Sequence, residues 1–199
     1  MTELETLNML LRLAGSSPVN SLESDHPDVA NATTTMNRIR QRAQKRGWWY
    51  NIDYGVIFYP DEAGFIKIPT TVTTIQFSDS NLVMRGRRLY DKEANSYMFT
   101  AQQECLKLIK NLEWDDMPES MQEYCAYYAA TEYIRDELED PTKEQSLKES
   151  AGMARLDLQK EDLAMGQYNV FNTQRIASAR GGIRPYNRNS GRFYGTPDR

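Results

Sequence analysis

Few side chains in this 199-residue sequence have the type and spacing that enzymatic chemistry requires. The single histidine, His26, precedes a proline, and no cysteine or serine motif lies near it. The two cysteines, Cys105 and Cys125, lack CxxC spacing, whereas a zinc site normally needs about four ligands. We therefore expect no catalytic residue and no metal site, and we interpret His26 as a solvent-facing residue where a helix begins.

Glycine patterns that bind phosphate groups are also missing from the sequence. Neither GxxxxGK[ST] nor GxGxxG occurs, and the RGG at residues 180–182 does not follow an expected strand. We therefore expect no cofactor.

Acidic side chains are abundant, and two of them could act together as a general acid and a general base. Residues 113–140 contain ten acids and one base, and Asp115, Asp116, Glu119 and Glu123 are the candidates. A glycosidase needs two carboxyl groups about 5–10 Å apart around a sugar. Acids at a helix start also complement the helix dipole. We prefer this second interpretation and retain a glycan hydrolase as an alternative function.

The carboxyl-terminal segment is strongly basic. Six arginines and one aspartate lie between residues 175 and 199, a local charge of +5 that leaves −9 for residues 1–174. Arginines spaced every four residues can neutralise phosphates or dock on an acidic protein with help from neighbouring aromatic side chains. We favour a protein partner or a neighbouring subunit and keep nucleic-acid binding as the alternative. The candidate interface residues are Arg180, Arg184, Arg188, Arg192, Phe193 and Tyr194.

A second basic and aromatic stretch, KRGWWY, surrounds Trp48 and Trp49. Its aromatic rings could stack on bases. We prefer the interpretation that the two tryptophans begin a strand and that at least one anchors a junction between helix and sheet.

Helical patterns occupy both ends of the sequence. Thr2 and Glu5 form a capping box, Gly15 ends the first helix, and a second helix runs from Pro27 to Gly47. A third helix begins at Pro118, and a fourth extends from Pro141 to about residue 170. Apolar residues spaced three and four apart predict a packing seam on these helices. The seam residues are Val29, Met36, Ile39 and Leu158.

The region between these helices changes to a strand pattern. Short segments rich in β-branched and aromatic residues, separated by turn residues, predict a meander of short strands. LKLIKNLEW fits either a strand or a helical turn, and we interpret it as a strand. The predicted fold class is α+β: a helical bundle platform (1–47 and 115–172), an inserted small antiparallel β domain (48–114) and an extended C-terminal tail (173–199).

The cellular setting can be predicted only in outline. The absence of a signal peptide favours free thiols in a reducing compartment, and no run approaches the ~18–20 apolar residues of a membrane span. We expect the protein to fold and assemble in cytoplasm.

Four stretches, in this order, resemble the tail tubular protein A family of short-tailed phages. They are LNMLLRLAGSSPVNSLES, HPDVANATTTMNRIRQRAQKRGWWYNID, the β region with YPDEAGFIKIP and MRGRRLYD, and EWDDMPESMQEYCAYYAATEYIRD. The resemblance covers about residues 4–170 and does not include the basic tail.

The resemblance implies a structural virion protein and not an enzyme. Members of this family form a dodecameric adaptor ring that joins the portal protein to the tail nozzle, a protein of the tail tubular protein B type. The ring continues the channel through which DNA passes, without specific binding, during genome ejection. The helical part is expected to contact the portal and the β part the nozzle. We therefore expect self, portal and nozzle as partners, and the phage tail of the virion as the location.

Overall fold

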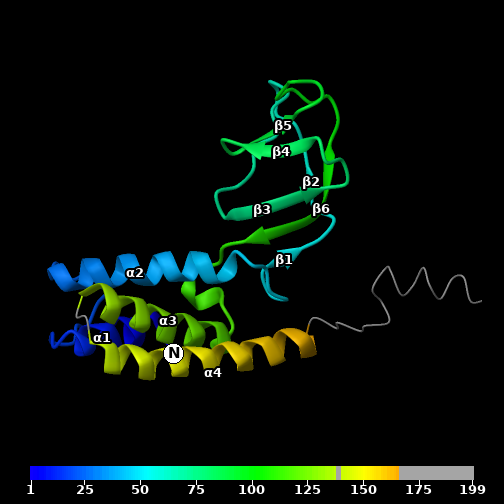
Figure 1. Cartoon of the computed structure of the whole chain (residues 1–199). Helices are drawn as coiled ribbons and strands as arrows, with labels where there is room; N and C mark the ends of the chain where they lie inside the picture. The colour runs from blue at the N-terminus through cyan, green and yellow to red at the C-terminus, as the bar shows by residue number, and fades with distance from the viewer. Residues whose placement is uncertain (138–139, 166–199) are drawn as a thin grey trace, which may run out of the picture. The chain divides into compact units, whose positions relative to one another are not determined.

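The computed structural model describes residues 1–137 and 140–165, which form four α-helices and a small set of antiparallel strands (Figure 1). The fold class is α+β, as predicted. The helices are α1 (Glu3–Leu13), α2 (Pro27–Gln44), α3 (Glu119–Glu137) and α4 (Pro141–Met165). The strands are β1 (Ile52–Asp53), β2 (Ile57–Phe58), β3 (Val72–Phe77), β4 (Leu82–Arg85), β5 (Arg88–Asp91) and β6 (Gln103–Lys110), and a short 3-10 turn spans Trp114–Asp116.

Helix α1 begins with the predicted capping box. The Glu5 N–H donates to the Thr2 hydroxyl (3.2 Å), and the Thr2 N–H donates to the Glu5 carboxylate (2.8 Å). The helix is followed by Gly15, whose φ of 78° lies in the left-handed region that favours glycine. Leu7, Leu10 and Leu11 are fully buried, whereas Leu4 is only partly buried.

Helix α3 packs against each of the other three helices (Figure 1). This central position explains why its apolar residues cover a broad face and not a narrow stripe. The core of the helical part also contains the four seam residues, each at most 2% exposed: Val29, Met36, Ile39 and Leu158.

Helix α4 is described as far as Met165, so its expected continuation to about residue 170 lies outside the described residues. On α4, Ala151 and Ala154 are buried beside the seam residue Leu158. Met165, which continues the same spacing, is 62% exposed.

The strand topology differs from the predicted meander. Strand β6 is the centre of the main sheet and pairs antiparallel with β1, β2 and β3, while β4 and β5 form a separate hairpin. The segments around Phe65 and Met98 form only isolated bridges. Of the residues 106–114 that we interpreted as a strand, 106–110 lie in β6, but Asn111 leaves it and Trp114 begins the 3-10 turn. The β part has its own small core, which contains Ile66, Leu89 and Leu108.

Trp48 anchors the junction between α2 and the strands. It is 2% exposed, and its indole N–H donates to the Ala43 carbonyl (2.9 Å). The side-chain amide of Asn51 then bridges the carbonyls of Gln44 (3.1 Å) and Lys110 (2.7 Å). The anchoring role was predicted correctly, but the tryptophans lie in a turn, and the first strand begins only at Ile52. The split into domains at residues 47 and 115 remains a prediction.

Candidate assembly surfaces

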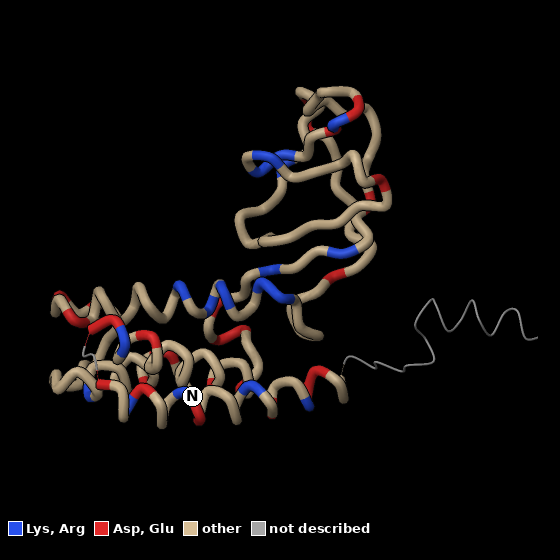
Figure 2. The backbone as a smooth tube through the Cα atoms, viewed as in Figure 1, with Lys and Arg blue, Asp and Glu red and all other residues tan. Residues whose placement is uncertain are grey.

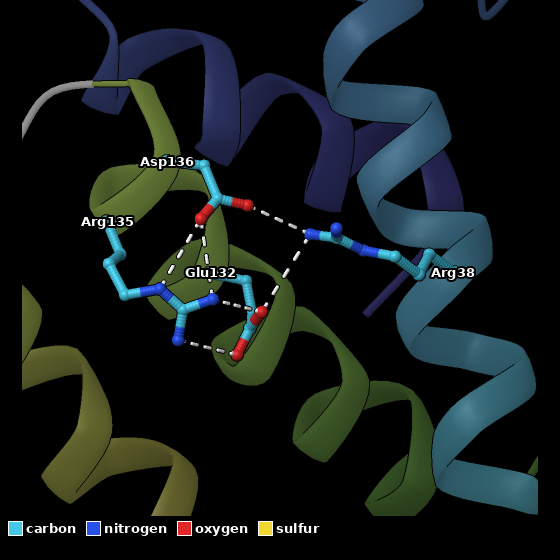
Figure 3. A network of polar contacts seen from close by, with 4 residues as sticks. All are labelled: Arg38, Glu132, Arg135 and Asp136. Carbon is cyan, nitrogen blue, oxygen red and sulfur yellow. Dashed lines mark hydrogen bonds and ion pairs between the residues drawn. The ribbon is translucent and has the colours of Figure 1, made fainter.

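A network of charged side chains joins α2 to α3 (Figure 3). The Arg38 guanidinium donates to Asp136 (3.0 Å) and lies 3.8 Å from Glu132, and Arg135 donates to Glu132 at 2.6 Å. The hydrogen bond from Arg38 lowers the pKa of Asp136. Glu132 is only 8% exposed, and a buried carboxylate is stable only when its charge is compensated. Arg38 and Arg135 provide this compensation. These groups are therefore occupied in holding the helices together.

A second polar cluster joins α2 to the segment that leaves β6. The buried Arg40 guanidinium forms an ion pair with Glu113. Gln44, also buried, donates to Asn111 (3.1 Å) and accepts from the Leu112 N–H (2.9 Å). This cluster fixes the place where the chain returns from strands to helices.

Three arginines gather beside the rings of Tyr124 and Tyr128 at the α3–α4 surface. The Arg42 guanidinium lies 5.6 Å from the Tyr128 ring centroid, and Arg42, Arg46 and Arg155 line one small pocket with both tyrosines. Among the described residues, no carboxylate lies within 4.0 Å of these three guanidinium groups. The pocket adjoins a groove of about 430 Å³ between α3 and α4. An anionic group from a partner could bind here.

Basic residues are concentrated in the second half of α2 and in the turn between β4 and β5 (Figure 2). The arginines of that turn are held by contacts within the β part. Arg87 donates to the Val72 carbonyl (2.6 Å), and Arg85 stacks 4.0 Å from the Tyr90 ring centroid. We therefore assign the turn a structural role.

The described residues leave two apolar surfaces of the helical part uncovered. On α4, large side chains point away from α3, and on α1 a groove of about 400 Å³ is lined by Met1, Met9 and Leu13 together with the charged residues Glu5 and Arg12. Exposed apolar patches of this kind are typical of protein interfaces. The exposed residues of α4 are Met153, Leu156, Leu163 and Met165.

The histidine and the two cysteines considered for chemistry occupy structural positions, whereas the candidate acids Asp115, Asp116, Glu119 and Glu123 are exposed. His26 is the N-cap of α2, and its ring nitrogen accepts from the Asp28 N–H (3.2 Å). Cys105 and Cys125 are free and buried, and burial raises the pKa of both thiols. Within residues 1–137 and 140–165, no three histidines, cysteines or carboxylates come together as a metal site would require.

The predicted interface residues are not among those that the structure describes. The basic residues Arg180–Arg192 and the aromatic pair Phe193 and Tyr194 lie outside the described residues. The seam residues Val29, Met36, Ile39 and Leu158 lie inside the core and cannot contact a partner directly.

Sequence reasoning missed the buried polar residues. Arg40 continues the seam, four residues after Met36 and three before Ala43, so its spacing could have revealed its burial. Glu132 lies four residues before Asp136, but no pattern in the sequence identifies Arg38 as their partner.

No helix among the described residues is both long and apolar enough to cross a membrane.

Comparison with known proteins shows that the chain is similar to tail tubular proteins. The family model described as tail tubular protein matches residues 4–191. Over 140 residues, which are 68% of this chain and 74% of the relative, the sequence is 29% identical to tail tubular protein A of Klebsiella phage KP34.

Proposed function

We propose a function for this chain from the premise that it belongs to the tail tubular protein family, whose model matches residues 4–191. The chain is thus a structural component of a phage tail and not an enzyme. The glycan hydrolase alternative is therefore abandoned.

We further propose that the chain forms an adaptor ring between the portal and the tail nozzle. The resemblance to the tail tubular protein A family implies twelve subunits in this ring. The observation that supports it is the apolar surface that the described helices leave uncovered. Three large side chains on the outer face of α4, Met153, Leu156 and Leu163, are each more than half exposed. Such a surface on a structural protein indicates association with other chains.

The helical part would contact the portal and neighbouring subunits, and the β part would contact the nozzle. Large side chains are exposed on the β part as well: Tyr54, Tyr59, Met98 and Leu106. Tyrosine and methionine are enriched in protein interfaces, so this surface suits a protein partner. Ring assembly is proposed to take place in the host cytoplasm.

The charge distribution supports a channel that DNA crosses without adhering. Residues 1–174 carry a net charge of −9, which repels a polyanion. The basic segment 176–199 is proposed to contact acids within 113–140 of a neighbouring copy, where arginine forms charge-assisted hydrogen bonds. Phe193 and Tyr194 would supply apolar contacts. Deletion after Ala179 should then weaken ring formation or portal attachment.

Nucleic-acid binding remains the second candidate, and the arginines around Tyr124 and Tyr128 favour it. Arg42 and Arg46 also lie near aromatic rings, as they would in a site for single-stranded nucleic acid. Under this alternative, Arg42→Ala should reduce DNA affinity and the steepness of its salt dependence.

The experiment that separates these functions is a mass measurement of the purified chain, alone and with its portal protein. A defined oligomer, or incorporation of the chain into a portal complex, would support the adaptor ring. A chain that stays monomeric in both conditions would overturn it. Salt-sensitive DNA binding by that monomer would support the alternative.

A further inference from the structure

Helix α4 is apolar on two opposite faces. At 3.6 residues per turn, the centres of its two apolar rows lie about 180° apart around the helix axis. The buried row, which packs on α3, is Ala151, Ala154 and Leu158, and the outer row is Met153, Leu156 and Leu163, with exposed fractions of 62%, 57% and 63%. A surface helix normally has one apolar stripe, and a helix that is apolar all round is buried. The outer row therefore indicates a second packing partner.

Gly152 supports this interpretation. It lies inside α4, where glycine is less favourable than alanine. A Cβ atom added there would meet nothing within 4 Å, so packing within this chain does not require a glycine. A bare backbone beside Met153 and Leu156 allows a neighbouring helix to approach closely.

The groove on α1 has the shape and chemistry to receive this face. Its apolar residues, Met1, Met9 and Leu13, are partly exposed, and α1 itself packs on α2 and α3. In the outer row of α4, three residues separate Met153 from Leu156, and seven separate Leu156 from Leu163. In the apolar row of α1, counted backwards along the chain, the steps are four residues from Leu13 to Met9 and eight from Met9 to Met1. The outer row of α4 spans about 15 Å at 1.5 Å per residue. In the groove, Met9 and Leu13 lie on α1, and Met1 extends the apolar row beyond the start of the helix.

An antiparallel arrangement matches the charges as well. The α1 groove carries Glu5 towards its start and Arg12 towards its end. The outer face of α4 carries Glu149 towards its start and Lys160 towards its end. When the helices run in opposite directions, Arg12 meets Glu149 and Glu5 meets Lys160.

We infer that the outer face of α4 docks antiparallel into the α1 groove of a second copy of this chain. Because the two surfaces differ, the contact is heterologous and repeats from copy to copy, as in a ring. The inference rests on the proposed adaptor ring and identifies the surfaces by which neighbouring copies touch.

The test is disulfide cross-linking of the full-length chain carrying both Met9→Cys and Leu156→Cys. Both natural cysteines are buried, so only the introduced thiols should react under native conditions. Mild oxidation should give a ladder of species larger than dimers. Met9→Cys alone and Leu156→Cys alone should give none, and dimers from Leu156→Cys alone would overturn the inference in favour of α4 packing on itself.

Mass measurement of the same samples distinguishes the possible failures. An oligomer that gives no ladder would overturn the docking surfaces and leave the ring in place. A monomer that gives no ladder at any concentration, and still fails to assemble with portal, would overturn both proposals.

A charge reversal provides a second, independent measurement. Arg12→Glu should raise the concentration of half-assembly by roughly tenfold, because a like-charge contact replaces an attractive one. Glu149→Arg should do the same, and the double variant Arg12→Glu/Glu149→Arg should restore assembly. Two single effects that add in the double variant would overturn the contact.

Discussion

The guanidinium of Arg40 is buried in the helical core, whereas the side chain of its ion-pair partner Glu113 is 74% exposed. The pair links α2 to the segment that follows β6, and the Nε atom of Arg40 has no hydrogen-bond partner among the described residues. The cost of burying Arg40 is therefore offset by one carboxylate that water can reach.

We predict that removing the acid costs more than removing the arginine. Glu113→Gln leaves a buried charge without its partner, and we expect a loss of ~1–2 kcal/mol in the free energy of unfolding, below the 3–5 kcal/mol of a fully buried pair because Glu113 is exposed. Arg40→Met leaves a solvated carboxylate and an apolar side chain in the core, so it should cost less than about 1 kcal/mol. Urea denaturation measures both.

The double variant Arg40→Met/Glu113→Gln provides the control. It should be no less stable than Arg40→Met alone, since the acid has no role once the arginine is gone. A further loss in the double variant would mean that Glu113 acts through another contact.

Two leucines of α4 provide a matched pair for separating core from interface. Leu158 is fully buried and Leu163 is 63% exposed. Leu158→Ala should lower the free energy of unfolding by ~2–5 kcal/mol, and Met36→Ala should have a similar effect. Leu163→Ala should change it by less than about 0.5 kcal/mol, as a surface substitution does.

The same two variants should rank differently in an assembly assay than in the measurement of the free energy of unfolding. If α4 docks on a neighbour, Leu163→Ala should weaken oligomer formation without a loss of helix content in circular dichroism. Equal effects of Leu158→Ala and Leu163→Ala on stability would contradict the burial of Leu158.

The helices were predictable because their signals are local. A capping box at Thr2, prolines in the first turns and apolar residues spaced three and four apart specify where a helix begins and which face it buries. The same periodicity could not show that α4 has two apolar faces with different partners. Met165 lies at the right spacing for the buried row, yet α3 does not cover it.

The strand order was not predictable in the same way. Which strands pair depends on contacts between residues far apart in the sequence, and no local pattern indicates that β6 pairs with β1, β2 and β3. The hairpin between β4 and β5 has a local signal in Gly86, but its two-residue turn also places the non-glycine residue Arg87 at positive φ, which the sequence does not indicate. The Arg40 and Glu132 ion pairs depend equally on tertiary structure.

Gly15 and Gly47 provide another matched pair. Both have positive φ, 78° and 81°, so alanine is strained at either position by about 1–2 kcal/mol. At Gly15 an added Cβ meets nothing within 4 Å, whereas at Gly47 it would lie 2.9 Å from the Cδ1 atom of Ile109. Gly47→Ala should therefore lower the free energy of unfolding by more than Gly15→Ala does.

Thermal unfolding of both variants measures this difference. The comparison isolates the close approach of Gly47 to β6, because the backbone strain is nearly the same in the two. If Gly15→Ala were the less stable variant, the contact between Gly47 and Ile109 would not limit the side chain at this junction.

The last prediction concerns alkaline pH. Burial raises the pKa of the Cys125 thiol from 9.0 to about 12, and it also raises the pKa values of Tyr50, Tyr124 and Tyr133. The native state thus keeps protons that the unfolded chain releases, so stability is fully present below pH 9 and falls as the pH rises towards 12.

The variant Cys125→Ala tests how much of the stability lost at alkaline pH is due to the Cys125 thiol. Between pH 9 and 10.5 the natural chain should lose about 1–2 kcal/mol more than the variant, since one group contributes up to ~1.4 kcal/mol per pH unit between its two pKa values. Burial of the tyrosines acts in both chains, so most of their contribution cancels in the difference, and the part that remains comes from the Cys125 charge, which also raises the pKa values of Tyr50 and Tyr124. Urea denaturation at pH 7, 9 and 10.5 supplies the values, and parallel curves for the two chains would show that Cys125 titrates normally in the folded protein.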